Sequence, residues 1–116
     1  MMGFRVLLIA MFGVLMVFTS LVIGAHGWGL MAIFFGDIAK MGWPGQFNLD
    51  FLFMLTLSAL WVAWRHAFSA VGFGLALLAL FGGSGFLTVY LFIVSLRAKG
   101  GMSEILIGPS RAARQA

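Results

Sequence analysis

Three long apolar stretches, separated by short polar segments, dominate the pattern of hydrophobic and polar positions along the chain. Residues 6–25 carry no charge, residues 47–64 carry only Asp50, and residues 68–96 carry no charge at all. A helix rises about 1.5 Å per residue, so about 20 residues cross the roughly 30 Å hydrocarbon core of a bilayer. The pattern predicts three transmembrane helices.

The second apolar stretch has marked ends. Residues 43–46, Trp-Pro-Gly-Gln, predict a turn before the helix, and polar side chains return at Arg65 and His66. We expect Asn48 to cap this helix and Asp50 to lie in its first turn, where the helix dipole favours an anion. The short connection at Arg65 and His66, most simply a solvated turn, predicts an antiparallel hairpin of the second and third helices.

The third apolar stretch is longer than one crossing requires. As a straight helix it would reach about 43 Å, and two crossings would need about 40 residues. We therefore expect a single helix that is tilted, kinked or extended beyond the hydrocarbon. The Gly-Gly-Ser-Gly cluster at residues 82–85 is the natural place for a kink or a close helix contact.

The first apolar stretch has two interpretations. Arg5 before it and the small residues Gly24 and Ala25 at its end resemble a secretory signal peptide. The run is longer than the 7 to 15 apolar residues, roughly, of a signal peptide, which favours a spanning helix.

The segments between and after these stretches are expected at the membrane surface. Residues 26–46 form a loop with Trp28 and Trp43 near its ends, as is typical of the bilayer interface. Residues 30–41 have near-helical apolar spacing, so this loop contains either a short interfacial helix or an irregular hairpin. The polar tail, residues 97–116, is expected to be disordered or interfacial.

Composition assigns the whole chain, residues 1–116, to a single all-α integral membrane domain. Apolar residues make up 63% and charged residues 9% of the sequence, whereas soluble domains carry about 25% charged residues. The net charge of +4 comes from scattered bases, which does not favour nucleic acid as a partner. No cysteine is present, so disulfides and thiolate sites are excluded. The expected partner is the lipid bilayer.

The positive charges also predict an orientation. Three crossings would place two bases, Arg5 and Arg65, on one side of the membrane and five on the other. The larger set consists of Lys40, Arg97, Lys99, Arg111 and Arg114. Because cytoplasmic segments are enriched in Lys and Arg, we expect the N-terminus outside and the C-terminus in the cytoplasm.

Three crossings also decide which polar side chains meet. They would bring His26, Asp50 and Arg97 to one membrane face, as candidates for a ligand site or an Asp50–Arg97 ion pair. His66 would lie at the opposite face, so no histidine pair is expected to hold a metal or haem. No cofactor, metal site or catalytic residue is predicted, since phosphate-loop, nucleophile-elbow and HExxH motifs are absent.

Small residues recur along the third stretch at helical spacing. Such residues let helix backbones approach closely, either inside the monomer or between subunits. The predicted packing residues are Gly72, Ala76, Ala79, Gly82, Gly83 and Gly85.

Several of these features together resemble a known family. They are His26-Gly27, the run FNLDF at residues 47–51 in a helix that ends at Arg65, and a glycine-rich third helix that ends before Arg97. Over residues 26–97 the chain resembles short bacterial membrane proteins classed as a domain of unknown function. The resemblance implies a three-helix protein of the bacterial inner membrane and no established activity. The chain departs from the family in lacking an acid at the end of the second helix.

Two functions from different classes follow. The first is a structural or accessory membrane protein that associates with itself or with a larger complex. The alternative is binding or transport of a small lipophilic molecule, such as a quinone, isoprenoid or lipid, near His26, Asp50 and Arg97. An enzyme that acts on such a molecule is the less favoured variant.

Overall fold

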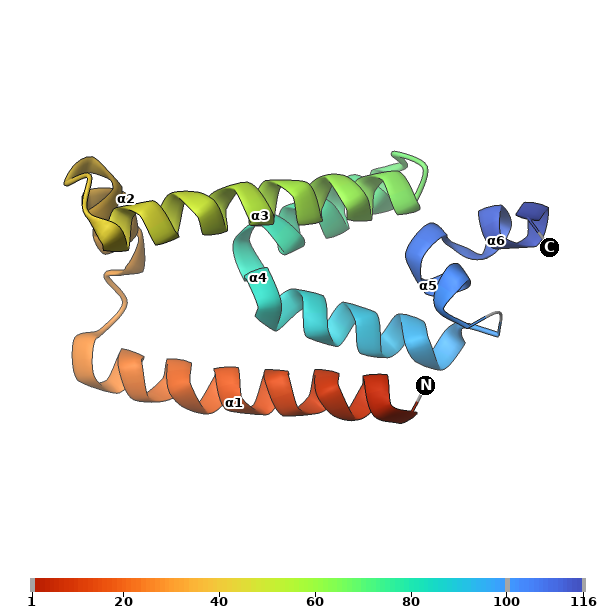
Figure 1. The fold of residues 1–116 in the computed structure, drawn as a ribbon, viewed down its shortest axis with the longest axis horizontal. Coiled ribbons are helices and arrows are strands. Elements are labelled where there is room, and N and C mark those ends of the chain that lie inside the picture. The colour runs from red at the N-terminus through yellow and green to blue at the C-terminus, as the bar shows by residue number, and fades with distance from the viewer. Residues whose placement is uncertain (1, 100, 116) are drawn as a thin grey trace.

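The computed structural model describes residues 2–99 and 101–115, and these residues form helices without any strand. The helices, shown in Figure 1, are α1 (Met2–His26), α2 (Leu30–Ala39), α3 (Trp43–Arg65), α4 (Ala70–Arg97), α5 (Met102–Ile107) and α6 (Pro109–Gln115). Three of them, α1, α3 and α4, are long and apolar enough to cross a membrane. The prediction of an all-α membrane fold is confirmed.

Helix α3 begins four residues earlier than the sequence predicts. The expected turn at residues 43–46 is wrong, because Pro44 lies in the first turn of the helix and Gly42 precedes it. Proline is tolerated there, since the first amides of a helix have no intrahelical acceptor. Asp50 consequently lies two turns inside α3 and Asn48 is not its cap.

Helix α2 confirms the short helix expected in the first loop, and it packs closely on the start of α3. The Asn48 side-chain amide donates a hydrogen bond to the Phe34 carbonyl, 3.1 Å away. A Cβ atom added at Gly45 would lie 2.9 Å from the Ile38 Cα atom. Glycine is therefore required where the two backbones meet.

Helix α4 turns back on itself at Gly83. The φ and ψ angles of Gly83 are 56° and −138°, which interrupts the helix between residues 70–82 and residues 84–97. In Figure 1 the first half of α4 runs along α3 to the middle of the molecule, and the second half returns beside α1. The kink expected at the glycine cluster is present, and it reverses the chain.

The reversal at Gly83 lies beside the midpoints of α1 and α3. A Cβ atom at Gly83 would meet Phe51 and Leu55 of α3, and one at Gly85 would meet Leu15 and Met16 of α1. Each half of α4 is about 20 Å long, about two thirds of the thickness of a bilayer core. Helix α4 therefore has the form of a helical hairpin, with each half shorter than a full crossing requires.

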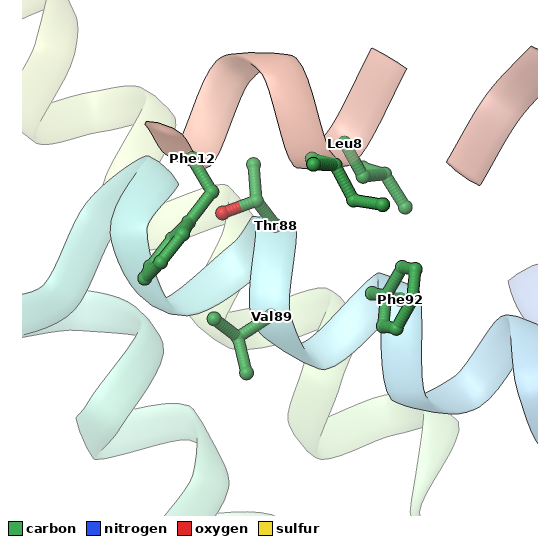
Figure 2. Close-up of a pocket in the computed structure, with 6 residues that line it drawn as sticks. Leu8, Phe12, Thr88, Val89 and Phe92 are labelled. Atoms are coloured by element: carbon green, nitrogen blue, oxygen red, sulfur yellow. The ribbon is translucent and has the colours of Figure 1, made fainter. Parts of the chain in front are cut away.

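The second half of α4 packs antiparallel to α1. The Arg5 guanidinium, near the start of α1, donates hydrogen bonds to the Ser95 hydroxyl at 3.0 Å and to the Ser95 carbonyl at 2.7 Å. Further along, Leu8 and Phe12 of α1 face Thr88 and Phe92 of α4 across a small apolar gap of about 140 Å³ (Figure 2). The start of α1 and the end of α4 thus lie together.

The buried core lies where both halves of α4 meet α3. Val62 of α3, Ala79 of the first half and Tyr90 of the second half form its buried cluster. The core therefore forms only when α3 and both halves of α4 are packed together.

The tail is helical rather than disordered, with α5 and α6 at the same end of the molecule as the N-terminus and the α3–α4 turn (Figure 1). Ile105 of α5 is 0% exposed. We call this end the Arg65 end, and the opposite end, with α2 and the start of α3, the Lys40 end. Three straight crossings would separate the start of α1 from the end of α4, whereas in the structure both lie at the Arg65 end because α4 returns.

Candidate functional site

Arg65 connects three helices at the Arg65 end. It is the last residue of α3, and its guanidinium donates to the Ile105 carbonyl at 2.6 Å, the Glu104 carbonyl at 3.2 Å and the Tyr90 hydroxyl at 3.1 Å. Carbonyls in the last turn of a helix commonly lack an intrahelical partner, and at the end of α5 the Glu104 carbonyl also accepts the Gly108 amide at 2.9 Å. The planar fork of arginine reaches several acceptors at once, which positions α5 against α3 and α4.

His66 and Tyr90 complete this hydrogen-bond network. The His66 Nε2 atom lies 2.7 Å from the Tyr90 hydroxyl, whose oxygen already accepts from Arg65. Burial, and then the charge of Arg65, lower the pKa of His66 below its ordinary value of 6.5. The ring is therefore neutral at pH 7, and the Tyr90 hydroxyl has its proton free to donate to Nε2.

Two indole rings hold the tail at the same place. The Trp61 ring nitrogen donates to the Leu106 carbonyl at 2.8 Å. The Arg111 guanidinium donates to the Trp64 carbonyl at 2.6 Å, and its central carbon lies 3.9 Å from the Trp64 ring centroid. This second contact is a close cation–π interaction.

These elements border an open pocket of about 930 Å³, which we call the cationic pocket. Its polar lining contains five basic side chains and one acid, namely Arg65, Arg97, Lys99, Arg111, Arg114 and Glu104. Its apolar lining comes from both halves of α4 and from α5, through Val71, Leu75, Ile93, Val94 and Ile107. Arg97 and Arg114 have no hydrogen-bond or ion-pair partner among the described residues. The pocket thus combines a basic rim with an apolar wall.

The sequence-predicted site is not assembled. Arg97 lines the cationic pocket beside Arg65, and Asp50 precedes Arg65 by fifteen residues of α3, or about 22 Å of helix. The predicted ion pair of Asp50 with Arg97 is therefore wrong, because the reversal of α4 carries Arg97 to the other end. His26 ends α1 at the Lys40 end, and both His26 and Asp50 are exposed.

Most of the predicted packing residues lie within the monomer. A Cβ atom at Gly72 would lie 3.3 Å from the Ala63 carbonyl of α3, and Ala79 is fully buried. Gly83 and Gly85 contact α3 and α1, as described above. Gly82 is exposed, and among the described residues its added Cβ atom would meet Phe86 of the same helix. Ala76 is half-buried. The monomer itself accounts for the contacts at Gly72, Ala79, Gly83 and Gly85.

Sequence reasoning missed three members of the site. The sequence predicts a solvated turn at Arg65 and His66, and it assigns no role to Tyr90. Tyr90 is the one tyrosine of the chain. A hydroxyl in an apolar stretch needs a partner when it is buried, and this is the signal by which the network could have been found.

No group of three His, Cys, Asp or Glu side chains that could hold a metal ion lies among the described residues. Comparison of the chain with protein-family models, with curated proteins and with solved structures finds no match. The resemblance to short bacterial membrane proteins therefore stays a prediction, and function is argued below from the geometry alone.

Proposed function

We propose that the chain is an accessory membrane protein that associates, through the reversal of α4, with a second copy of itself or with a larger membrane complex. The observation that carries the proposal is the exposed side of this reversal at mid-depth. Phe81 is 73% exposed, and Gly82 and Ser84, on either side of Gly83, are exposed as well.

The physical reason is the behaviour of backbone groups in lipid. A helix that ends and restarts inside the bilayer presents amides and carbonyls that lipid tails cannot hydrogen-bond. Such breaks occur at membrane depth only where protein covers them or where they line a water-filled cavity. Helices α1 and α3 contact one side of the reversal, so another protein chain is the natural cover for the exposed side.

The arrangement also supports an orientation that differs from the one expected from three full crossings. With α1 and α3 as full crossings and α4 re-entrant, the Arg65 end carries six bases and the Lys40 end carries only Lys40. The six are Arg5, Arg65, Arg97, Lys99, Arg111 and Arg114. We place both termini in the cytoplasm, on the inner face of a bacterial cell membrane, as the positive-inside rule requires.

A second candidate, binding of a lipophilic molecule, is favoured by the cationic pocket. The sequence predicts the binding site near His26, Asp50 and Arg97. Because Arg97 lies in the cationic pocket at the Arg65 end, we propose that pocket as the binding site instead. A basic rim above an apolar wall suits an amphipathic molecule rather than an uncharged quinone.

Association through the reversal is tested by photo-crosslinking in native membranes. A benzophenone amino acid replaces Phe81, and the matched control replaces Met54, which is 61% exposed at mid-depth on α3. We expect protein adducts from position 81 and none from position 54. An adduct of twice the chain mass identifies self-association, and a different mass identifies a complex. Lipid adducts alone at position 81 would overturn the proposal.

A further inference from the structure

The cationic pocket holds the entire net charge of the chain. The sequence contains seven bases and three acids, for a net charge of +4. Five bases and Glu104 line the pocket, which is also +4. The remaining charges are Arg5, Lys40, Asp37 and Asp50, and they cancel.

The chain supplies little negative charge to balance this concentration. Within residues 2–99 and 101–115, Arg65 donates to neutral acceptors, the carbonyls of Glu104 and Ile105 and the Tyr90 hydroxyl. Arg111 contacts the Trp64 carbonyl and ring. The Glu104 carboxylate accepts the backbone amide of Lys99 at 3.1 Å. Several cations held near one another without matching acids create a field that favours an anionic ligand.

The basic side chains favour phosphate among anions. Four of the five are arginines, whose planar fork matches the oxygens of a phosphate group with two parallel hydrogen bonds. Arg97 and Arg114 are without partners among the described residues, so their donors are available to a ligand. A phosphate monoester, with up to two negative charges, would neutralise part of the pocket.

The rest of the pocket favours a lipid over a soluble phosphate. Val71, Leu75 and Ile93 line it beside the bases, and Val71 and Ile93 are 67% and 45% exposed. The pocket begins at Arg65, where a membrane-spanning helix ends, which is the depth of lipid headgroups. Its volume of about 930 Å³ is that of a ligand site.

We propose that the cationic pocket binds an anionic lipid with a phosphate monoester headgroup, the phosphate between Arg97 and Arg114 and the hydrocarbon chain along Val71, Leu75 and Ile93. This inference rests on lipid binding as the second candidate function and is independent of association through the reversal of α4.

The test uses the full chain in a mild zwitterionic detergent, with binding followed by native mass spectrometry. The probes are phosphatidic acid, phosphatidylcholine and inorganic phosphate. We expect one phosphatidic acid per chain at saturation, with at least tenfold preference over phosphatidylcholine. Inorganic phosphate should compete only weakly, because it gains nothing from the apolar wall.

Three variants locate the site. Arg97→Gln and Arg114→Gln should each weaken phosphatidic acid binding by about tenfold, as expected for the loss of one charge-assisted hydrogen bond. Lys40→Gln removes an exposed base at the opposite end and should leave binding unchanged. Circular dichroism and size in detergent confirm that each variant is folded.

Three results would overturn the proposal. Equal affinity for phosphatidic acid and phosphatidylcholine would show that the pocket does not discriminate lipids by headgroup charge. Equal loss in Lys40→Gln and Arg97→Gln would show general attraction of anions to the chain. Inorganic phosphate that competes as strongly as phosphatidic acid would identify a soluble ligand. Crosslinking at position 81 reports on association separately, so failure of one proposal does not decide the other.

Discussion

The side chain of His66 hydrogen-bonds that of Tyr90 at 2.7 Å, although 24 residues separate them. A straight helix would place residues this far apart in sequence about 36 Å from each other. The contact exists because α4 turns back at Gly83 and returns Tyr90 to the Arg65 end. One backbone reversal therefore determines both the shape of the fold and the composition of the cationic pocket.

Replacement of Gly83 by alanine should destabilise the fold. Its φ of +56° is unfavourable for any residue with a side chain, and the added Cβ atom would lie 3.2 Å from the Phe51 ring. We expect a loss of about 1–3 kcal/mol in the free energy of unfolding, measured by denaturant titration in detergent. Gly74→Ala is the control, because its added Cβ would meet no side chain or other segment of the described residues within 4 Å, apart from its chain neighbours. Equal stability of the two variants would contradict the strain argument.

Removal of the Tyr90 hydroxyl should uncouple the α3–α4 turn from the second half of α4. Tyr90→Phe keeps the ring in the core but deletes the bonds to Arg65 and His66, at a cost of about 1–3 kcal/mol. A double-mutant cycle with His66→Ala measures the coupling. The double variant should lose less than the sum of the two single losses, and strict additivity would show that the two side chains act independently.

Stability should fall as the pH drops through the range in which His66 titrates. The pKa of His66 is lower in the folded chain than the ordinary histidine value of 6.5, because burial and the Arg65 charge disfavour the protonated ring. The unfolded chain therefore binds a proton first as the pH falls, and stability present above pH 6.5 is lost below it. His66→Gln should flatten the thermal unfolding profile between pH 7 and pH 5, roughly the range of histidine titration. His26 remains in both proteins, so an unchanged profile would exclude His66 as the source.

Arg65→Lys should release the tail while the long helices remain folded. A lysine ammonium cannot reach the Glu104 carbonyl, the Ile105 carbonyl and Tyr90 together with the geometry of a guanidinium fork. We expect faster amide hydrogen exchange in α5 and α6, with helix content nearly unchanged. Arg114→Gln, which removes an unpartnered arginine of the same tail, is the control and should exchange at the wild-type rate. Unchanged protection in Arg65→Lys would mean that Trp61 and Arg111 hold the tail without it.

Orientation is directly testable because the chain has no cysteine. Cysteine introduced at Lys40 should react with a membrane-impermeant maleimide added outside intact cells, and cysteine at Lys99 should react only after the cells are opened. Labelling of the Lys99 position but not the Lys40 position from outside would reverse the orientation. Equal labelling of both positions would indicate that α4 crosses the membrane completely, because residues 40 and 99 would then lie on the same side.

The sequence by itself determined the class of the molecule and the positions of its long helices. Length, hydropathy and the spacing of charges are local properties, so α1, α3 and α4 could be located without tertiary information. The glycine cluster likewise marked the break in α4, because a chain with these glycines tolerates backbone angles that other residues do not. Even here the local signal had two meanings, since Pro44 fits a turn and the first turn of a helix equally well.

Only the tertiary structure decided where the chain goes after Gly83. The same cluster is compatible with a gentle kink or with a full reversal, and the contacts of Gly83 with α3 and of Gly85 with α1 select the reversal. That choice moves Arg97 from the Asp50 side to Arg65, and it brings Tyr90 to His66. These pairs are distant in sequence and lie on different segments, so their proximity depends on the packing of whole helices, which no local pattern of residues encodes.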